Sequence, residues 1–321
     1  MTAPPVTVVL FGAGAVGSLF GARFVAAGRP VLLIGRADNV AAIRAHGLRV
    51  EGVGAGTFRC DAATDLPAGL PVDLALLTVK TFDLPFAAGA LGRAVPPTPV
   101  LLPQNGIGLS AVARSALESA GWTDPTPWIV RAVHSVPATW VGPGVVRAAG
   151  TGEVVLPDPP AGGRLARSID AFVRLFRDAG IPVRTVPVIE REVWRKALVN
   201  AAINPVTAVH RVPNGQLSSG PLRDEASRLL REALAVANAL GFDLSASEAE
   251  ADLDRVVRAT SGNRSSMLQD IERGRPTEID AISGEILRLG GSRGLELPAT
   301  RAIVGRIRAE VARRGPPAQA S

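Results

Sequence analysis

Two lysines stand out in this sequence because the chain otherwise takes its positive charge from arginine. Lys80 and Lys196 are the two lysines among 35 basic residues, which leaves 33 arginines. A guanidinium keeps its proton at any working pH, whereas an ammonium group can donate a proton to a developing alkoxide and be reprotonated. Lys196 is therefore a candidate general acid.

The residues around Lys196 predict a buried helix with one polar stripe. Residues 194–203 are apolar apart from three polar side chains, and a helix that is apolar on most sides is buried. Lys196, Asn200 and Asn204 stand four residues apart and share one helical face, although Pro205 disfavours a helical conformation at Asn204. Such a stripe either faces a polar cleft or is satisfied by hydrogen bonds within the protein, and the spacing alone leaves both open.

A glycine-rich turn near the N-terminus predicts a dinucleotide site. It reads GAGAVG between an apolar run and a helix-like segment. In this pattern the first glycine allows a tight turn, the second lets the backbone approach a pyrophosphate, and the third lets helix and strand pack closely. The predicted cofactor contacts are the six turn residues Gly12, Ala13, Gly14, Ala15, Val16 and Gly17.

The residue after the second apolar run indicates which dinucleotide is bound. A carboxylate there selects NAD, while an arginine accommodates the 2′-phosphate of NADP. The chain has Arg36 at this point, with Asp38 close enough to take a ribose hydroxyl. An arginine could stand there by chance in so arginine-rich a chain, but the pattern favours NADPH.

Two further polar residues follow apolar runs that read as buried parallel strands. Lys80 follows LALLTV, and Asn105 follows VLLPQ. Open α/β sheets bind ligands at the carboxyl ends of their strands, so both residues are candidate site residues. The alternatives without a functional role are a surface lysine for Lys80 and an ordinary turn for Asn105, since Asn-Gly is a common turn former.

A third polar cluster has the sequence NRSSMLQDIERGRPTEID. Its polar residues can be explained either as N-terminal caps of helices or as part of a binding site. Ser266 with Gln269 fits a capping box, and Thr277 with Asp280 fits another. Glu278 would then stand in a helix's first turn, where the helix dipole favours a carboxylate.

Several kinds of site find no support in the sequence. Cys60 is the single cysteine, so no intrachain disulfide can form. The three histidines, His46, His134 and His210, show neither metal-ligand spacing nor a neighbouring carboxylate. Ser135 has no nucleophile-elbow context, so we assign no hydrolase triad and no metal. A net charge of +6 without a basic run argues against a nucleic-acid partner, and no signal peptide or membrane span is seen, which makes the cytoplasm the expected compartment.

The elements that must position these residues predict two domains. Strand, helix and strand signals fill the first part of the chain, and the pattern from Ile189 to Arg314 is helical. We expect an α/β Rossmann-type dinucleotide-binding domain over 1–187, an all-helical substrate and catalytic domain over 188–314, and a tail over 315–321.

With these motifs in order, the chain resembles the ketopantoate reductase (2-dehydropantoate 2-reductase) family. The resemblance runs nearly end to end through GAGAVG, Arg36, TVKTFD, QNGIG, WRKALVNAAINP and SSMLQDIERGRPTEID. It implies NADPH-dependent reduction of ketopantoate to pantoate in pantothenate biosynthesis, with the cofactor and the 2-keto acid bound between two domains. It implies that Lys196 is the general acid and Glu278 orients the substrate, with Lys80 and Asn105 on the cofactor side. The residues that it assigns to the substrate are Asn105, Lys196, Asn200, Asn204, Asn214, Asn263, Ser266 and Glu278.

Two departures from the family pattern leave the identity of the 2-keto acid substrate undecided. Ser283 stands where relatives often have asparagine, and residues 131–142 are less glycine-rich than usual. A same-fold reductase of another 2-keto acid therefore remains the main alternative, and a non-catalytic NADPH-sensing protein is the alternative from another class. A homodimer is the one assembly considered.

Overall fold

The computed structural model describes residues 7–67 and 69–314, so the predicted tail over 315–321 lies outside the described residues. The chain forms two compact units. The first comprises Met1–Gln104 and Gly108–Ile189, and the second comprises Asn105–Ile107 and Glu190–Ser321. The short segment at Asn105 therefore belongs with the helical part of the chain, which the sequence did not indicate.

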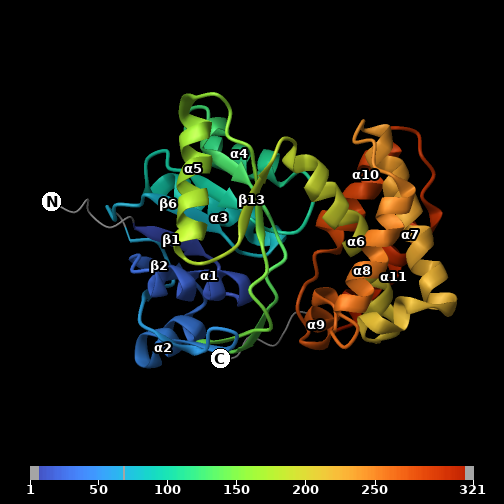
Figure 1. Ribbon diagram of the computed structural model, residues 1–321, viewed down its shortest axis with the longest axis horizontal. Helices are drawn as coiled ribbons and strands as arrows, with labels where there is room; N and C mark the ends of the chain where they lie inside the picture. The colour runs from blue at the N-terminus through green and yellow to red at the C-terminus, as the bar shows by residue number, and fades with distance from the viewer. Residues whose placement is uncertain (1–6, 68, 315–321) are drawn as a thin grey trace. The chain divides into compact units, whose positions relative to one another are not determined.

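A six-stranded parallel sheet organises the first unit (Figure 1). Its strand order is β5-β2-β1-β6-β7-β8, and every neighbouring pair is parallel. The strands are β1 (Val8–Phe11), β2 (Val31–Ile34), β5 (Asp61–Ala63), β6 (Leu74–Leu77), β7 (Val100–Leu102) and β8 (Ile129–Arg131). Because the chain moves from β1 to β2 on one side and later adds β6 on the other, the strand order reverses at β1, which is where such sheets bind ligands.

Helices cover both faces of this sheet, as the apolar runs require. Val8 and Leu10 of β1 point into a core with the rings of Phe20 and Phe176, whose centroids lie 5.2 Å apart, and Val9 points into a second core on the opposite face. The helices of the unit are α1 (Ala15–Ala26), α2 (Ala37–His46), α3 (Leu84–Ala94), α4 (Leu109–Ser119) and α5 (Gly163–Asp178), with short 3₁₀ turns η1 (Thr81–Asp83) and η2 (Thr126–Trp128). Strands buried on both faces explain why their sequences are continuously apolar.

Two smaller sheets complete the first unit. One has the order β10-β11-β3-β4 and the other the order β13-β12-β9. Their strands are β3 (Leu48–Gly52), β4 (Gly56–Phe58), β9 (Val133–His134), β10 (Ala138–Gly142), β11 (Val145–Ala148), β12 (Val154–Pro157) and β13 (Val183–Val186). Five of these strands, β9 to β13, follow residue 128, whereas β3 and β4 come before it.

The second unit is built from helices around its own apolar core (Figure 1). They are α6 (Ile189–His210), the turn η3 (Asn214–Ser218), α7 (Gly220–Ala239), α8 (Ala246–Ala259), α9 (Ser266–Glu272), the π-helical turn η4 (Asp280–Gly284), α10 (Glu285–Gly291) and α11 (Pro298–Arg314). The predicted fold class, a Rossmann-type α/β part followed by a helical part, is confirmed.

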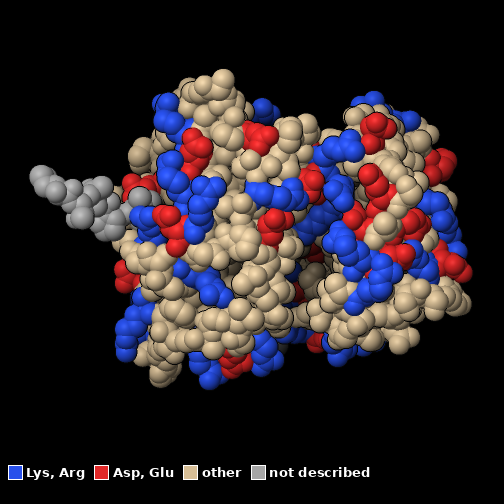
Figure 2. Space-filling model, viewed as in Figure 1, with Lys and Arg blue, Asp and Glu red and all other residues tan. Residues whose placement is uncertain are grey.

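Charge is distributed over the molecule without a dominant patch on the face that Figure 2 shows, where basic and acidic side chains are interspersed. Among the described residues, no helix is long and apolar enough to span a bilayer.

Candidate active site

The glycine-rich turn joins β1 to α1 with the geometry that a pyrophosphate site needs. Gly12 has φ +108°, and a Cβ there would come within 2.5 Å of the backbone of Val79, while a Cβ on Gly17 would collide with the Gly12 carbonyl. A Cβ on Gly14 would meet nothing within 4 Å, so the turn is open at the point where a phosphate must approach. The first-turn N–H groups of α1 have no acceptor within the helix, and no acidic residue stands there to compete for them. These residues fit a dinucleotide.

Two side chains that the sequence analysis missed hold this turn in place. Thr78 Oγ1 lies 3.0 Å from the Phe11 carbonyl and 2.9 Å from that of Gly12. Asn39 of α2 is 6% exposed; its Nδ2 donates to the Ala13 carbonyl at 2.6 Å and its Oδ1 accepts from the Gly144 N–H at 2.6 Å. Nothing close in sequence reveals these pairings, because the partners of Asn39 lie 26 and 105 residues away.

Arg36 and Lys80 lie after strands on opposite sides of β1. Arg36 is exposed directly before α2, and Lys80 is half-buried directly before η1. Burial raises the pKa of Asp83 while the charge of Arg36 acts in the opposite direction, so the guanidinium and this carboxyl group are close enough to interact. The charge of Arg36 therefore acts on Asp83, a residue that follows β6.

In the second unit, α6 carries the stripe that the sequence predicts. The helix continues through Pro205 to His210, so Asn204 is helical despite the proline that follows it. Lys196 and Asn200 are half-buried and Asn204 is buried, whereas Arg195 turns away to pair with Asp252 of α8 at 2.7 Å. The three predicted residues thus share one face of a largely apolar helix.

The start of α9 differs by one residue from the predicted capping box. Ser265, not Ser266, is the N-cap, and its hydroxyl accepts from the Leu268 N–H at 3.2 Å. Ser265 is buried and also lies 2.7 Å from the hydroxyl of Thr207 on α6. This leaves Ser266 exposed in the first turn of α9, with its hydroxyl not engaged as the cap.

Two of the predicted substrate residues are joined directly by the backbone. The Asn214 N–H donates to the Asn263 carbonyl at 2.9 Å, and Asn214 Nδ2 donates to Thr260 Oγ1 at 2.9 Å. Asn214 is buried and its Oδ1 accepts no hydrogen bond, while Asn263 is exposed. The turn η3 and the loop before α9 therefore form one structure.

Glu278 lies just before the π-helical turn η4, and the short segment that carries Asn105 is hydrogen-bonded to this turn through Ile107. Glu278 is 9% exposed and lies just before the helix, where Thr277 Oγ1 accepts from the Ile279 N–H at 3.5 Å rather than from Asp280 as a capping box requires. The carbonyl of Ala281 accepts from the Ile107 N–H at 3.1 Å, so the segment that carries Asn105 is anchored on η4. Asn105 is half-buried, and its Oδ1 is buried without a hydrogen-bond partner.

The remaining nucleophile and acid–base candidates have ordinary roles. Burial, with a smaller contribution from Asp61, raises the pKa of the Cys60 thiol to about 11, which leaves it unreactive at neutral pH. The sequence suggested no carboxylate partner for His210, but its Nε2 lies 2.8 Å from Glu225 of α7, a pairing at the surface. Ser135 is exposed, and its hydroxyl accepts from the Glu153 N–H at 3.0 Å.

The parallel sheet with its strand-order reversal at a glycine-rich turn, followed by a helical unit, defines the class of nicotinamide-dinucleotide-dependent oxidoreductases. Residues 8–161 match the family described as "Ketopantoate reductase PanE/ApbA", and residues 188–311 match "Ketopantoate reductase PanE/ApbA C terminal". The chain belongs to the ketopantoate reductase family.

Individual relatives agree over nearly the full length. The chain is 32% identical to a 2-dehydropantoate 2-reductase of Archaeoglobus fulgidus over 302 residues, which is 94% of this chain and 96% of the relative. A ketopantoate reductase structure from Ralstonia eutropha aligns with a TM-score of 0.86 at 32% identity, covering 96% of this chain and 99% of the other. A D-mandelate dehydrogenase bound to NADH and anilino(oxo)acetate aligns with a TM-score of 0.88 at 26% identity, covering 97% and 100%.

Proposed function

We propose that the protein is an NADPH-dependent 2-dehydropantoate 2-reductase, which reduces the C2 carbonyl of ketopantoate to give pantoate. The observation that carries the proposal is the polar face of α6, where half-buried Lys196 and Asn200 precede buried Asn204 on an otherwise apolar helix. A solvated surface lysine would not need such surroundings, whereas a positioned proton donor does.

The cofactor and groups of this chain would divide the reaction between them. NADPH would supply the hydride; residues 12–17 would hold its pyrophosphate, Arg36 would bind its 2′-phosphate, and Lys80 and Asn105 would contact its nicotinamide half. The ammonium of Lys196 donates the proton to the carbonyl oxygen as negative charge develops there. Glu278 accepts a hydrogen bond from the substrate's hydroxyl, which a buried carboxylate does strongly.

The substrate's carboxylate requires donors, and the second unit offers several amides and a hydroxyl. In the proposal these are Asn200, Asn204, Asn214, Asn263 and Ser266. The link between the Asn214 N–H and the Asn263 carbonyl supports treating those two as one preorganised group.

The test is NADPH oxidation with ketopantoate, measured for the wild type, Lys196→Ala and Lys196→Arg. Removal of a positioned acid typically lowers kcat by a hundred- to ten-thousand-fold. Lys196→Arg is the matched control for charge, because a guanidinium keeps the positive charge but does not release its proton, so it should be nearly as slow as Lys196→Ala. Near wild-type turnover in either variant would exclude Lys196 as the acid.

A second candidate substrate is favoured by the likeness to D-mandelate dehydrogenase and by Ser283. Ser283 is 1% exposed in η4, the turn that follows Glu278, and it stands where the family resemblance leads us to expect asparagine. A panel that includes ketopantoate and 2-oxo-2-phenylacetate, compared by kcat/KM, would separate the two reactions. Tight NADPH binding without turnover of any 2-keto acid would instead support a sensor.

The proposal also includes a compartment and an assembly. The reaction draws on the cellular NADPH pool, which supports a cytoplasmic location, and a two-fold homodimer is the assembly that we propose, since such dimers are the commonest soluble oligomers. Light scattering of the purified protein would give its mass directly.

A further inference from the structure

Gln104 is a buried polar side chain without a partner. It is 8% exposed, and neither its Oε1 nor its Nε2 forms a hydrogen bond to any described residue. A buried amide left in this state costs about 1–3 kcal/mol for each unsatisfied group, and a leucine of similar size would avoid that cost. Unsatisfied buried polar groups of this kind have a small set of explanations, which are local strain, a bound water or ion, a ligand, or a catalytic role.

The backbone of Gln104 is held rigidly by a buried guanidinium. Arg131 of β8 is 7% exposed; its Nη2 donates to the Gln104 carbonyl at 2.7 Å and its Nη1 donates to the carbonyls of Leu102 and Ala132 at 2.5 and 2.7 Å. The end of β7 is thereby fixed while the side-chain amide of Gln104 is left unpaired. Rigid support behind a free polar group is the arrangement of a binding residue.

The strand order places Gln104 on a particular side of the dinucleotide site. Arg36 follows β2, the glycine-rich turn follows β1, and Gln104 follows β7, which lies on the other side of β1 in the order β2-β1-β6-β7. With the pyrophosphate at β1 and the 2′-phosphate at β2, the other nucleoside of the cofactor lies over β6 and β7. Gln104 is therefore on the nicotinamide side.

The chemistry of the unsatisfied atoms selects the group that they bind. Gln104 offers one donor group and one acceptor together, so its complement must offer an acceptor and a donor in the same geometry. A phosphate offers acceptors alone, whereas the carboxamide on the nicotinamide ring offers both. We propose that the Gln104 amide pairs with the nicotinamide carboxamide through two N–H···O hydrogen bonds, an inference that rests on the nicotinamide cofactor of the proposed function.

The experiment compares NADPH with its 3-acetylpyridine analogue, in which a methyl ketone replaces the carboxamide and the N–H donor is lost. Dissociation constants are measured by calorimetry without substrate for the wild type, Gln104→Leu and Gln104→Met, and the melting temperature of each protein is measured without ligand. The wild type should bind NADPH at least about tenfold more tightly than the analogue, as expected when a buried acceptor loses its donor. Both variants should bind NADPH about as weakly as the analogue, with melting temperatures at or above that of the wild type.

Gln269→Met is the matched control. The Nε2 of Gln269 donates to the Arg264 carbonyl at 2.9 Å, so its amide is already used within the second unit. This variant should lose some thermal stability and keep the wild-type preference for NADPH over the analogue, which is the reverse of the pattern expected for Gln104.

The ratio of the two dissociation constants decides the outcome. If either Gln104 variant keeps the wild-type ratio, the inference is overturned, whatever happens to its melting temperature. If the wild type binds neither NADPH nor NADH, which carry the same nicotinamide carboxamide, both the inference and the proposed function fail. If the ratio collapses in the variants but ketopantoate is not reduced by the wild type, the contact stands and only the proposed substrate fails.

Discussion

Single side chains reveal their roles in this protein through partners that are distant in sequence. Lys196 attracts attention because lysine is rare in this chain, Asn105 because it follows a predicted strand, and Glu278 because of the family resemblance. Asn39 and Gln104 do not, since an amide's importance depends on which atoms face it after folding. The shift of the α9 cap from Ser266 to Ser265 has the same origin: adjacent serines fit the capping pattern almost equally, and the hydroxyl of Thr207, 58 residues away, contacts the one that caps.

Asn39→Asp should weaken NADPH binding without unfolding the protein. The new carboxylate can still accept from the Gly144 N–H, but it repels the Ala13 carbonyl to which Asn39 now donates. Loss of a buried hydrogen bond costs about 0.5–1.5 kcal/mol, so we expect the Kd for NADPH to rise by up to about tenfold while kcat at saturation changes little.

Asn238→Asp is the control for that substitution. Asn238 clamps Leu244 in the second unit through the same pair of bonds, Nδ2 to a carbonyl at 3.0 Å and an N–H to Oδ1 at 2.7 Å. It should leave the NADPH Kd unchanged and lower stability less than Asn39→Asp, because Asn238 is exposed whereas Asn39 is buried. An equal rise in Kd for both variants would show that Asn39 has no specific role at the turn.

Among the helices and strands, apolar periodicity and the glycine stops predicted most of the fold. The apolar run before GAGAVG, the helix-like segment after it and the second apolar run correspond to β1, α1 and β2, and Gly28 follows α1 with φ +75°. The π-helical turn η4 was not predictable from its composition, and the carbonyl of its Ala281 accepts from the N–H of Ile107, which is distant in sequence. The passage of α6 through Pro205 also depends on tertiary packing, which overrides the local preference.

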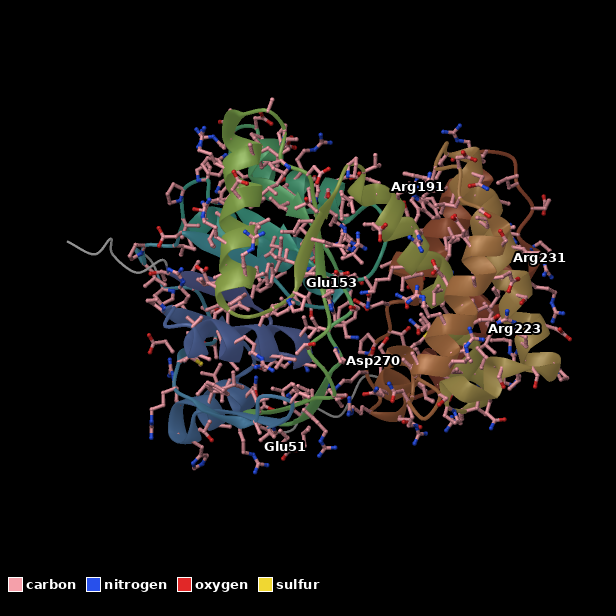
Figure 3. The ribbon with its side chains drawn as sticks, viewed as in Figure 1. Glu51, Glu153, Arg191, Arg223, Arg231 and Asp270 are labelled. Carbon is pink, nitrogen blue, oxygen red and sulfur yellow. The ribbon has the colours of Figure 1, made fainter. Side chains whose placement is uncertain are left out.

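Ion pairs in the second unit make its free energy of unfolding decrease as the pH falls into the acidic range. Asp252 of α8 joins Arg195 of α6 at 2.7 Å and Arg255 at 2.6 Å, and Figure 3 shows Arg223 of α7, which reaches Glu250 of α8 at 2.7 Å. Burial alone would raise the pKa of Asp252, but hydrogen bonds from Arg255 and Arg195 outweigh it and lower the pKa below 3.8.

Asp252→Asn should therefore destabilise the protein at neutral pH and matter less in acid. A carboxyl group whose pKa is lower in the folded state contributes stability above its unfolded pKa, near 3.8, and loses it as the pH falls through the folded value. We expect a difference in unfolding free energy of about 1 kcal/mol at pH 7 that shrinks below about pH 4. Urea unfolding at several pH values measures it, and Asp224→Asn, which removes an exposed charge from α7, should give no such trend.

For the molecule as a unit, the sequence indicated the division into an α/β part and a helical part but not the path of the chain between them. The segment Asn105–Ile107 lies inside the stretch that reads as Rossmann-like, yet it belongs with the helical unit. Nothing in QNGIG signals this, because both its anchor on Ala281 and the packing of Ile107 against the helical core are made with residues far along the chain.

Ile107→Ala should destabilise the helical unit although the residue lies far from it in sequence. The half-buried side chain packs against the core of that unit, and its truncation should cost about 1–2 kcal/mol, somewhat less than a fully buried isoleucine. Denaturant unfolding followed by circular dichroism would measure the loss. Val112→Ala, a truncation of an exposed valine on nearby α4, should change stability by less than about 0.5 kcal/mol.

The three-residue crossing also limits how this protein can be recombined. Because Asn105–Ile107 returns to the first unit at Gly108, the chain passes between the two units three times, after Gln104, Ile107 and Ile189. A chimera that takes residues 1–189 from this protein and the helical unit from a relative would combine residues 105–107 of this chain with a helical unit that evolved with a different tripeptide. Exchanges that keep residues 105–107 together with 190–314 should yield better-folded hybrids than exchanges at the single boundary that the sequence suggests.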